Sequence, residues 1–423
     1  MQCERLTASE HPATTAAALR DLIPAPESVR ERVAEIIAEV RGHGDVALLD
    51  YTRRFDTAGN EPGAIKVRDD ELERATAALS PDVRHGIERA IENLEAVMVG
   101  GNPHEPVAVE LGANQIVQRH VPVARAAVYV PGGRAPYPST VVMGVVPARM
   151  AGVAHITVCA PPRSDGDVDP VILAAAALTG ASAVYRMGGA QAIAALAYGT
   201  ESVPPVDVIV GPGNLYVQEA KRQVFGQVGI DGFAGPSDLL ALATGDADPE
   251  PLILDLLAQA EHGPGTLVVA VSDAPELLDL LEKRLVAGAD TGAVAALVDA
   301  ADPEQALAVA EGFAPEHLQL MGAHAEALAD RVTKAGCLFV GSGAGTAFGD
   351  YIAGSNHILP TNGAARFASS LRPGHFLRHF SEVRIADPSE LARSAAPLAR
   401  AEGFELHARS MEARIRDNDP LRR

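Results

Sequence analysis

The sequence predicts an α/β protein in which parallel sheets are wound by helices. Short runs rich in β-forming residues alternate with Ala- and Leu-rich helical runs, which is typical of this class. The strand-like runs are HITVCA, AVYRMG, DVIVG, TLVVAV and CLFVG, which begin at residues 155, 183, 207, 266 and 337. A chain of 423 residues is long enough for more than one such sheet. The Gly- and Pro-marked stretch 232–240 is a plausible crossing point between two sheets.

The amino-terminal part of the chain reads as helices followed by strands. Apolar residues at helical spacing follow Ser28 and Glu31, which have the form of a capping box, so we expect a helix that ends at Gly42. Residues 69–98 form a second amphipathic helical region. In residues 105–133, apolar and polar side chains alternate between glycines, and this pattern predicts extended strands.

Charge and composition favour a protein that acts on small molecules. A formal net charge of -20 argues against nucleic-acid binding, which needs clustered Lys and Arg. The first 25 residues lack the apolar core of an export signal, and no run reaches the roughly 18 uncharged residues of a membrane span. Cys3, Cys159 and Cys337 have neither an even count nor C-x-x-C spacing, so neither disulfides nor a thiolate zinc site are indicated. We therefore expect a cytoplasmic protein with a small-molecule substrate, no nucleic-acid partner and no membrane association.

The usual dinucleotide-binding fingerprint is absent. The stretches GPGNLYV and GSGAGTAFG both miss the G-x-G-x-x-G spacing. Three glycine-rich turns remain between a strand-like and a helical run: VPGGRAPYPST, MGGAQAI and GPGNLYV. The backbone amides of such turns can face a phosphate or a carboxylate, although many such turns bind nothing.

Side chains that suit a divalent cation occur in three separate stretches. They are Gln259 and His262 on one face of a helix end, Asp350 and His357 in a Gly-rich loop, and Glu402 and His407 near the carboxyl terminus. Two imidazoles, one carboxylate and an amide oxygen would suit Zn²⁺, with substrate at the open positions. Taken singly, each stretch is equally well an exposed helix end or a surface loop, because the groups lie far apart in the sequence.

Glu316 and His317 are adjacent where a helical run gives way to a strand-like one, in the stretch GFAPEHLQL. An imidazole with its ordinary pKa of about 6.5 is mostly neutral near pH 7 and can accept a proton repeatedly. The pair therefore suits acid–base catalysis. The alternative without a function is an ordinary surface pair at the start of a strand.

Seven long motifs resemble those of the histidinol dehydrogenase family, in the same order and spacing. They are YVPGGRAPYPSTVVM, VDVIVGPGNLYVQEAKRQVFG, GIDGFAGPSD, LLAQAEHGP, FAPEHLQL, GDYIAGSNHILPTNGAARF and AEGFELHARS. The resemblance extends from about Ser28 to Ile415. It implies two incomplete Rossmann-like domains with parallel sheets, one inserted in the other, plus small N- and C-terminal segments. The implied division is an N-terminal segment 1–25, a first domain 26–125 and 238–372, an inserted domain 126–237, and a C-terminal tail 373–423 that reaches the partner subunit.

The resemblance also implies an oxidoreductase of histidine biosynthesis, an NAD-dependent homodimer with one Zn²⁺ per subunit. Its reaction takes L-histidinol through L-histidinaldehyde to L-histidine. By matching motif, the zinc ligands are Gln259, His262, Asp350 and His407, the catalytic pair is Glu316 and His317, further substrate contacts are Ser237, His357 and Glu402, and the NAD contacts are Tyr129, Gln191 and Asn214. The zinc ligands and His317 also contact the substrate, and each zinc site is shared between subunits.

The resemblance assigns a separate task to each catalytic residue. His317 would deprotonate the alcohol and later the aldehyde hydrate, while Glu316 would prepare the attacking water. Zinc has no redox role, so it would position the imidazole and amine nitrogens of the substrate, and NAD would accept the hydride.

Three stretches depart from the family pattern. Asp238 stands where the motif usually has Glu, residues 92–101 lack a frequent F-H pair, and residues 372–382 are atypical. Two alternatives therefore stay open: a related NAD-dependent dehydrogenase of another polar alcohol, such as a sulfonated diol, and a zinc-binding regulator without turnover. The stretch APYPSTVVM and the pair Glu402 and His407 favour the histidinol-specific branch.

Overall fold

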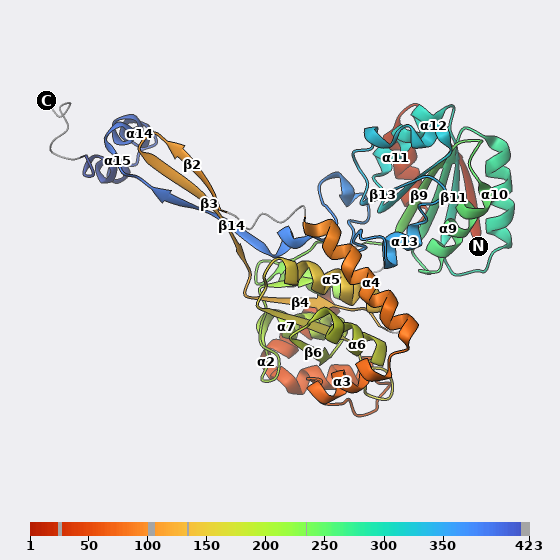
Figure 1. The fold of residues 1–423 in the computed structure, drawn as a ribbon, viewed down its shortest axis with the longest axis horizontal. Coiled ribbons are helices and arrows are strands. Elements are labelled where there is room, and N and C mark those ends of the chain that lie inside the picture. Colours follow the sequence, from red (N-terminus) through yellow and green to blue (C-terminus); the bar gives the residue numbers. More distant parts are fainter. Residues whose placement is uncertain (24–27, 100–105, 133–134, 234, 416–423) are drawn as a thin grey trace. The chain divides into compact units, whose positions relative to one another are not determined.

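A computed structural model describes residues 1–23, 28–99, 106–132, 135–233 and 235–415. The chain forms two compact units. The first comprises Met1–Asn102 with Val123–Phe376, and the second comprises Pro103–Pro122 with Leu377–Arg423. The first unit contains two separate parallel sheets, and the second contains one antiparallel sheet (Figure 1).

The larger parallel sheet has six strands in the order β1-β11-β10-β9-β12-β13. Their bounds are β1 (Gln2–Thr7), β9 (Asp238–Ala243), β10 (Leu267–Ser272), β11 (Val294–Asp299), β12 (His317–Met321) and β13 (Cys337–Val340). The central strands are almost entirely buried, which is why they read as continuous apolar runs rather than as alternating ones.

Helices cover both faces of the six-stranded sheet, and Figure 1 shows α10 and α11 on opposite sides of its strands. The helices α9 (Pro249–Ala260) and α10 (Pro275–Ala287) pack into one core, and α1 (Pro12–Asp21) and α11 (Pro303–Phe313) into the other. The short helices are α12 (Ala323–Glu326), α13 (Thr346–Tyr351), η2 (Ala329–Arg331), η3 (Ala364–Arg366) and η4 (Pro373–Phe376).

The smaller parallel sheet has five strands in the order β6-β5-β4-β7-β8. Their bounds are β4 (Arg125–Tyr129), β5 (His155–Ala160), β6 (Ala183–Arg186), β7 (Val208–Val210) and β8 (Gly229–Ile230). One face packs on α2 (Arg30–Phe55), α7 (Gly189–Tyr198) and α8 (Leu215–Val224). The helix α5 (Pro138–Met150) packs on the strands β4 and β5 and contacts α4 (Pro81–Met98) and α6 (Pro170–Thr179). The helix α3 (Asp69–Ala78) packs on α6.

Both parallel sheets share one strand order. From the central strand, the chain adds two strands on one side and then two on the other: β9, β10, β11, then β12, β13, and likewise β4, β5, β6, then β7, β8. This order, 3-2-1-4-5, is that of a Rossmann fold without its sixth strand, with the switch point beside the central strand. The predicted α/β class with two Rossmann-like sheets is confirmed, whereas the division into domains stays a prediction.

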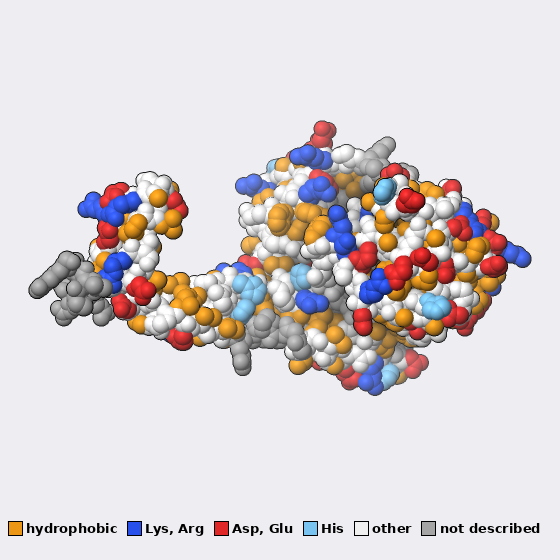
Figure 2. All heavy atoms as spheres, turned by 90° about the horizontal axis from the view of Figure 1, so that it is seen from above, with side chains coloured by type: hydrophobic (Ala, Val, Ile, Leu, Met, Phe, Trp, Pro, Cys, Tyr) orange, Lys and Arg blue, Asp and Glu red, His pale blue; other side chains and the backbone are white. Residues whose placement is uncertain are grey.

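The second unit is an antiparallel sheet with two helices. The sheet has the order β14-β3-β2, with β2 (Val107–Leu111), β3 (Asn114–Pro122) and β14 (Leu377–Arg384), and the helices are α14 (Ser389–Ala401) and α15 (Glu405–Glu412). Its core consists of little more than three alanines, and many of its apolar side chains are exposed, as the orange surface of this unit in Figure 2 shows.

Local predictions met mixed outcomes. The five strand-like runs all form strands, and residues 107–129 contain three more. The predicted capping box is wrong, because Val29 occupies the N-cap position without a side-chain cap. The predicted helix end at Gly42 is close to the observed one: α2 breaks at Gly44, whose φ of 56° leaves the helical range, and a second helical segment that was not predicted continues to Phe55.

Parts of three quoted stretches, residues 100–101, 133–134 and 234, lie outside the described residues. Among the described helices, none is both long and apolar enough to cross a bilayer.

Candidate active site

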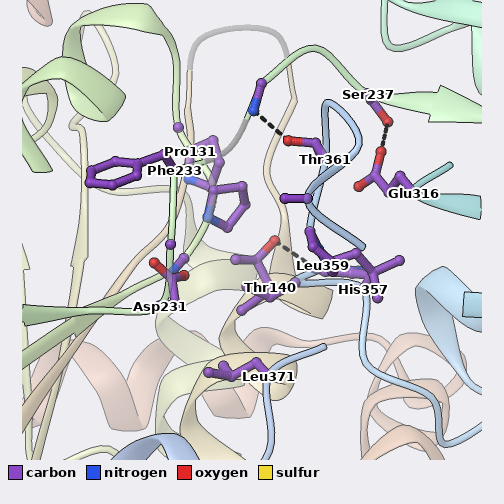
Figure 3. A pocket seen from close by; sticks show the side chains of 18 of the residues that line it. Pro131, Thr140, Asp231, Phe233, Ser237, Glu316, His357, Leu359, Thr361 and Leu371 are labelled. Carbon is purple, nitrogen blue, oxygen red and sulfur yellow. Dashed lines mark hydrogen bonds between the residues drawn. The ribbon is translucent and has the colours of Figure 1, made fainter. Parts of the chain in front are cut away.

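The first unit contains a cavity of about 980 Å³ that collects most of the predicted site residues. Its lining includes Ser237, His262, Glu316, His317, Asp350 and His357 (Figure 3 labels three of them). Ser237 precedes β9, and His317 begins β12, so this wall lies at the amino-terminal ends of two neighbouring strands. The usual ligand crevice of such sheets lies at the carboxyl ends.

A tight corner places the adjacent pair Glu316 and His317. The helix α11 ends at Phe313, and Ala314 follows with a φ of 50°, in the left-handed region that non-glycine residues rarely adopt. Pro315 then leads directly into β12. Both ionisable side chains are buried: Glu316 is 7% exposed and His317 is 3% exposed. The pair is therefore not an ordinary surface pair, because buried ionisable groups need specific partners.

Glu316 is held by a relay of hydrogen bonds. The amide Nε2 of Gln259 donates to the hydroxyl of Ser237 at 2.7 Å, and that hydroxyl donates to Oε2 of Glu316 at 2.6 Å. Figure 3 shows the second of these bonds. The backbone N–H of Asp238 donates to the same carboxylate oxygen at 3.1 Å. The side-chain nitrogen of Gln259 thus donates a hydrogen bond within the protein, and the side-chain carbonyl oxygen is the atom that would suit a cation.

His317 lies between two acceptors. Its Nδ1 is 3.2 Å from the backbone carbonyl of Asp238, and its Nε2 is 3.3 Å from Oδ1 of Asp350. His357 is held differently: its Nδ1 is 2.8 Å from the backbone carbonyl of Asp350, and its Nε2 is 3.1 Å from the hydroxyl of Thr140. The carbonyl requires a proton on Nδ1 of His357, so Nε2 is the nitrogen that accepts from Thr140.

These surroundings shift the pKa values in opposite directions. Burial disfavours the charged form of His317, but the carboxylates of Glu316 and Asp350 outweigh burial and raise its pKa to about 9. Burial lowers the pKa of His357, and Asp350 offsets it only in part. Two carboxylates therefore favour the imidazolium form of His317 in this arrangement, and the neutral form, which can accept a proton, is its minor form below that pKa.

The carboxyl groups also respond to burial and to each other. Burial raises the pKa of Glu316 despite the neighbouring imidazole of His317. Burial and the negative charge of Glu316 raise the pKa of Asp238 to about 7. Burial opposes ionisation of Asp350 as well, but the hydrogen bond and charge of His317, with the imidazoles of His357 and His262, hold its pKa below the usual range. Perturbed acids and bases gathered in one cavity are characteristic of a functional site.

The four predicted zinc ligands are divided between the two units. His262 and Asp350 line the cavity, Gln259 is buried directly behind Ser237, and His407 belongs to the second unit. Across the described residues, no three side chains of His, Cys, Asp or Glu form a ready metal cluster. The donor set of the first unit, an imidazole, a carboxylate and an amide oxygen, nonetheless fits Zn²⁺ chemically and leaves positions open.

Glu402 and His407 lie on the exposed side of the second unit. Glu402 is the C-cap residue that follows α14, and His407 lies in the first turn of α15, where its ring stacks on Phe404 at a centroid distance of 5.0 Å. Both side chains are exposed, which agrees with the alternative that this stretch is a surface helix without a functional role. Their role in a site therefore stays a prediction.

The three predicted cofactor contacts line a second cavity of about 560 Å³. Tyr129 ends β4, Gln191 lies in the first turn of α7, and Asn214 caps α8 by accepting from the N–H groups of Tyr216 and Val217. This cavity lies at the carboxyl ends of β4 and β7, the switch point of the five-stranded sheet. Pro131, Gly132 and Asn214 line both cavities.

Protein partners already engage two of these contacts. The hydroxyl of Tyr129 accepts from the N–H of Gly189 at 3.1 Å, and Nε2 of Gln191 donates to Asp56 at 3.2 Å. Both side chains are almost fully buried. They therefore shape the wall of the cavity, and any cofactor would meet them at its edge.

Sequence reasoning missed several residues that shape the site. Thr140 was quoted only as part of a motif, yet its hydroxyl fixes His357 (Figure 3). Lys221 is 1% exposed, and its ammonium donates to Asp231 and to the carbonyl of Gly211, both at 2.6 Å. Asp231 also accepts from the N–H of Gly211 at 2.7 Å. No local sequence pattern predicts these hydrogen bonds of Lys221, because a Lys on an amphipathic helix usually faces water.

Comparison with known proteins gives a consistent picture. The family model described as histidinol dehydrogenase matches residues 24–415. A histidinol dehydrogenase of Parasynechococcus marenigrum is 43% identical over 402 residues, covering 92% of each chain, and one of Pseudomonas syringae pv. syringae is 41% identical over 409 residues, covering 93% of this chain and 91% of the relative. The crystal structure of histidinol dehydrogenase from Elizabethkingia anophelis is similar with a TM-score of 0.88 at 30% identity, covering 98% of each chain.

Proposed function

Because the chain belongs to the histidinol dehydrogenase family, we propose that it uses Zn²⁺ and NAD to oxidise L-histidinol through L-histidinaldehyde to L-histidine, the last step of histidine biosynthesis. The observation that carries the proposal is the cavity in which Glu316, His317, Asp350 and His357 meet, since it provides acids and bases of different pKa around one space.

The second cavity supports NAD as the hydride acceptor. It lies at the switch point of a Rossmann-like sheet, and it combines the aromatic rings of Phe55 and Tyr216 with the cationic Arg32. Aromatic faces suit a base, and a cation with helix amino ends suits phosphates. Because three residues line both cavities, a dinucleotide in the second would reach the substrate in the first.

The acid–base roles follow from the contacts. When bound, NAD would accept one hydride in each of the two oxidations. In its neutral form, His317 would accept the hydroxyl proton of the alcohol and later that of the aldehyde hydrate, and Glu316 would act as the base for the water that adds to the aldehyde. The hydrogen bond from Ser237 and the N–H of Asp238 fix Glu316 for this task.

Zinc fits the donor atoms of Gln259, His262 and Asp350, with His407 as a fourth ligand. When bound, it would supply a Lewis acid that holds the nitrogens of the substrate and offsets the negative charge of Asp350. The proposed mechanism assigns the proton transfers to His317 and Glu316.

A homodimer would bring Glu402 and His407 to the zinc site of the partner subunit. In support, the second unit exposes Val107, Leu111, Val383, Leu398 and Leu406, each more than half accessible. A small unit with so few buried side chains is better stabilised by packing on another chain. We also propose a cytoplasmic location, as suits a biosynthetic enzyme without a spanning helix among its described residues.

The cavity favours histidinol over a sulfonated diol. Among the described lining residues, Lys221 is the sole Lys or Arg, and its ammonium is already bound by Asp231 and Gly211. A sulfonate would need a cation, whereas an imidazole substrate needs acceptors and donors of the kind present.

Incubation of the purified protein with L-histidinol and NAD tests the proposal directly. We expect two NADH for each L-histidine formed. NADH formation from a sulfonated diol but not from histidinol would favour the related dehydrogenase, and zinc binding without turnover of either would favour the regulator.

A further inference from the structure

Two histidines face each other across the antiparallel ladder of the second unit. In the register of β3 and β14, His120 is directly opposite His379. One step beyond the strands, the N–H of Val123 donates to the carbonyl of Phe376 at 2.9 Å. Hydrogen-bonded and non-hydrogen-bonded pairs alternate along an antiparallel ladder, so the pair three steps further, His120 with His379, falls on a non-hydrogen-bonded position. At such positions opposing side chains approach most closely.

The two imidazoles contact each other through their Nδ1 atoms. Their Nδ1 atoms are 2.6 Å apart, their ring centroids 4.6 Å apart, and their planes meet at 82°. Two facing ring nitrogens repel each other unless one carries a proton or both lone pairs are directed at the same cation. A directly opposed pair thus needs either a shared proton or a metal ion.

The face of the ladder that carries the pair suits a cation. Residues alternate between faces, so the neighbours of the pair on its own face are Gln118, Pro122, Leu377 and Ser381. None of these is charged. The nearby ion pair of Arg119 with Glu382 lies on the opposite face. A metal ion between the two rings would therefore meet no cation among its neighbours on the same face of β3 and β14.

We propose that His120 and His379 form a two-imidazole chelate for a first-row divalent transition-metal ion. Neutral imidazole suits Zn²⁺, Ni²⁺ and Cu²⁺, and water or a further ligand would fill the remaining positions. The site uses none of the residues of the two cavities. It joins β3 to β14, the two strands through which the second unit connects to the rest of the chain, and a bound ion would resist their separation.

Metal counting with Ni²⁺ tests this inference on the full-length protein. The protein is first saturated with Zn²⁺ under conditions that fill the proposed catalytic site, dialysed against Ni²⁺ at neutral pH, and analysed for both metals. We expect the wild type to hold one equivalent of metal per chain more than either His120→Gln or His379→Gln. His85→Gln removes an exposed histidine of α4, and Arg119→Gln disturbs the same strands from the other face; both should retain the extra equivalent.

A spectroscopic measurement keeps the test independent of folding in the variants. Electron paramagnetic resonance of Cu²⁺ added to the zinc-loaded wild type should show coupling to two imidazole nitrogens. The inference is overturned if wild type and both histidine variants bind the same number of ions, if only one of the two variants loses the ion, or if the Cu²⁺ spectrum shows fewer than two nitrogens. A shared proton alone would give the first of these results.

Discussion

Asp238 and Glu316 each accept a hydrogen bond from the backbone of the other. The N–H of Glu316 donates to Oδ1 of Asp238 at 2.7 Å, and the N–H of Asp238 donates to Oε2 of Glu316 at 3.1 Å. These two hydrogen bonds join the start of β9 to the residue that precedes β12, and the two strands are neighbours in the six-stranded sheet. Asp238, the residue that departs from the usual motif, therefore holds the backbone of the proposed catalytic pair Glu316 and His317.

Replacing Asp238 by Ala should reduce both stability and turnover. The buried N–H of Glu316 would lose its acceptor, which costs about 1–3 kcal/mol, and the corner at Glu316 would be free to shift. Asp238→Asn keeps an acceptor oxygen and should retain more of both properties. Chemical denaturation and the rate of NADH formation measure the two effects. Equal losses in the Ala and Asn variants would show that the hydrogen bond does not hold the corner.

The roles of Glu316 and His317 should be distinguishable by comparing histidinol and histidinaldehyde as substrates. Because only the second oxidation needs an activated water, Glu316→Gln should slow oxidation of histidinaldehyde more than oxidation of histidinol to the aldehyde. His317→Asn should slow both, since it removes the base for each hydroxyl proton. Single-turnover NADH formation from each substrate distinguishes the steps. An equal loss on both substrates for Glu316→Gln would contradict the division of roles.

Zinc content should depend on the proposed ligands. Asp350→Asn and His262→Ala should each strip the metal and abolish turnover while the fold persists, because an incomplete ligand set holds the ion weakly. Elemental analysis and circular dichroism measure metal and fold together, and His85→Ala serves as a matched loss of an exposed histidine. Full zinc occupancy in both ligand variants would rule out these residues as ligands.

A mixed dimer tests whether His407 crosses to the partner subunit. If it does, a dimer of one His262→Ala chain with one His407→Ala chain has one site with every ligand intact and one that lacks two ligands. That dimer should recover activity, although each parent homodimer is inactive, because a two-fold interface makes both crossings equivalent. Co-refolding followed by an NADH assay measures the recovery. Confirmed heterodimers that stay inactive would mean that the tail folds back on its own chain.

Asp56 should make stability depend on pH. Burial raises its pKa to about 7, although Gln191 and the backbone of Gly188 stabilise the carboxylate. Between about pH 4 and 7 the folded chain thus keeps a proton that the unfolded chain loses, so this contribution to stability falls as pH rises and levels off above pH 7. Relative to wild type, Asp56→Asn should become more stable by up to about 1.4 kcal/mol per pH unit across this range.

Melting temperatures of Asp56→Asn and wild type at several pH values between 4 and 8 measure this trend. Asp50→Asn, which removes an exposed carboxylate of α2, serves as the matched control. A constant difference between Asp56→Asn and wild type at all pH values would contradict the raised pKa.

Local sequence patterns determined the elements and the identity of the candidate residues. Runs such as 155–160 form strands because β-branched and apolar residues suit a buried parallel strand, and the run between Pro249 and Ala260 forms a helix from its apolar spacing. The helix predicted to end at Gly42 breaks at Gly44, because a glycine readily adopts the positive φ that interrupts a helix. The second helical segment, which continues to Phe55, was not predicted, and the helix α2 as a whole packs against α7 and the five-stranded sheet.

Only the tertiary structure decided which groups are neighbours and therefore what they do. Both sheets adopt one strand order although no repeat is visible in the sequence, because pairing depends on crossover geometry rather than on residue identity. His317 alone predicts a neutral imidazole, yet the fold places it against Glu316 and Asp350 and thereby raises its pKa. A pKa depends on burial and on charges within a few ångströms, and those distances exist only once residues far apart in the sequence have packed together.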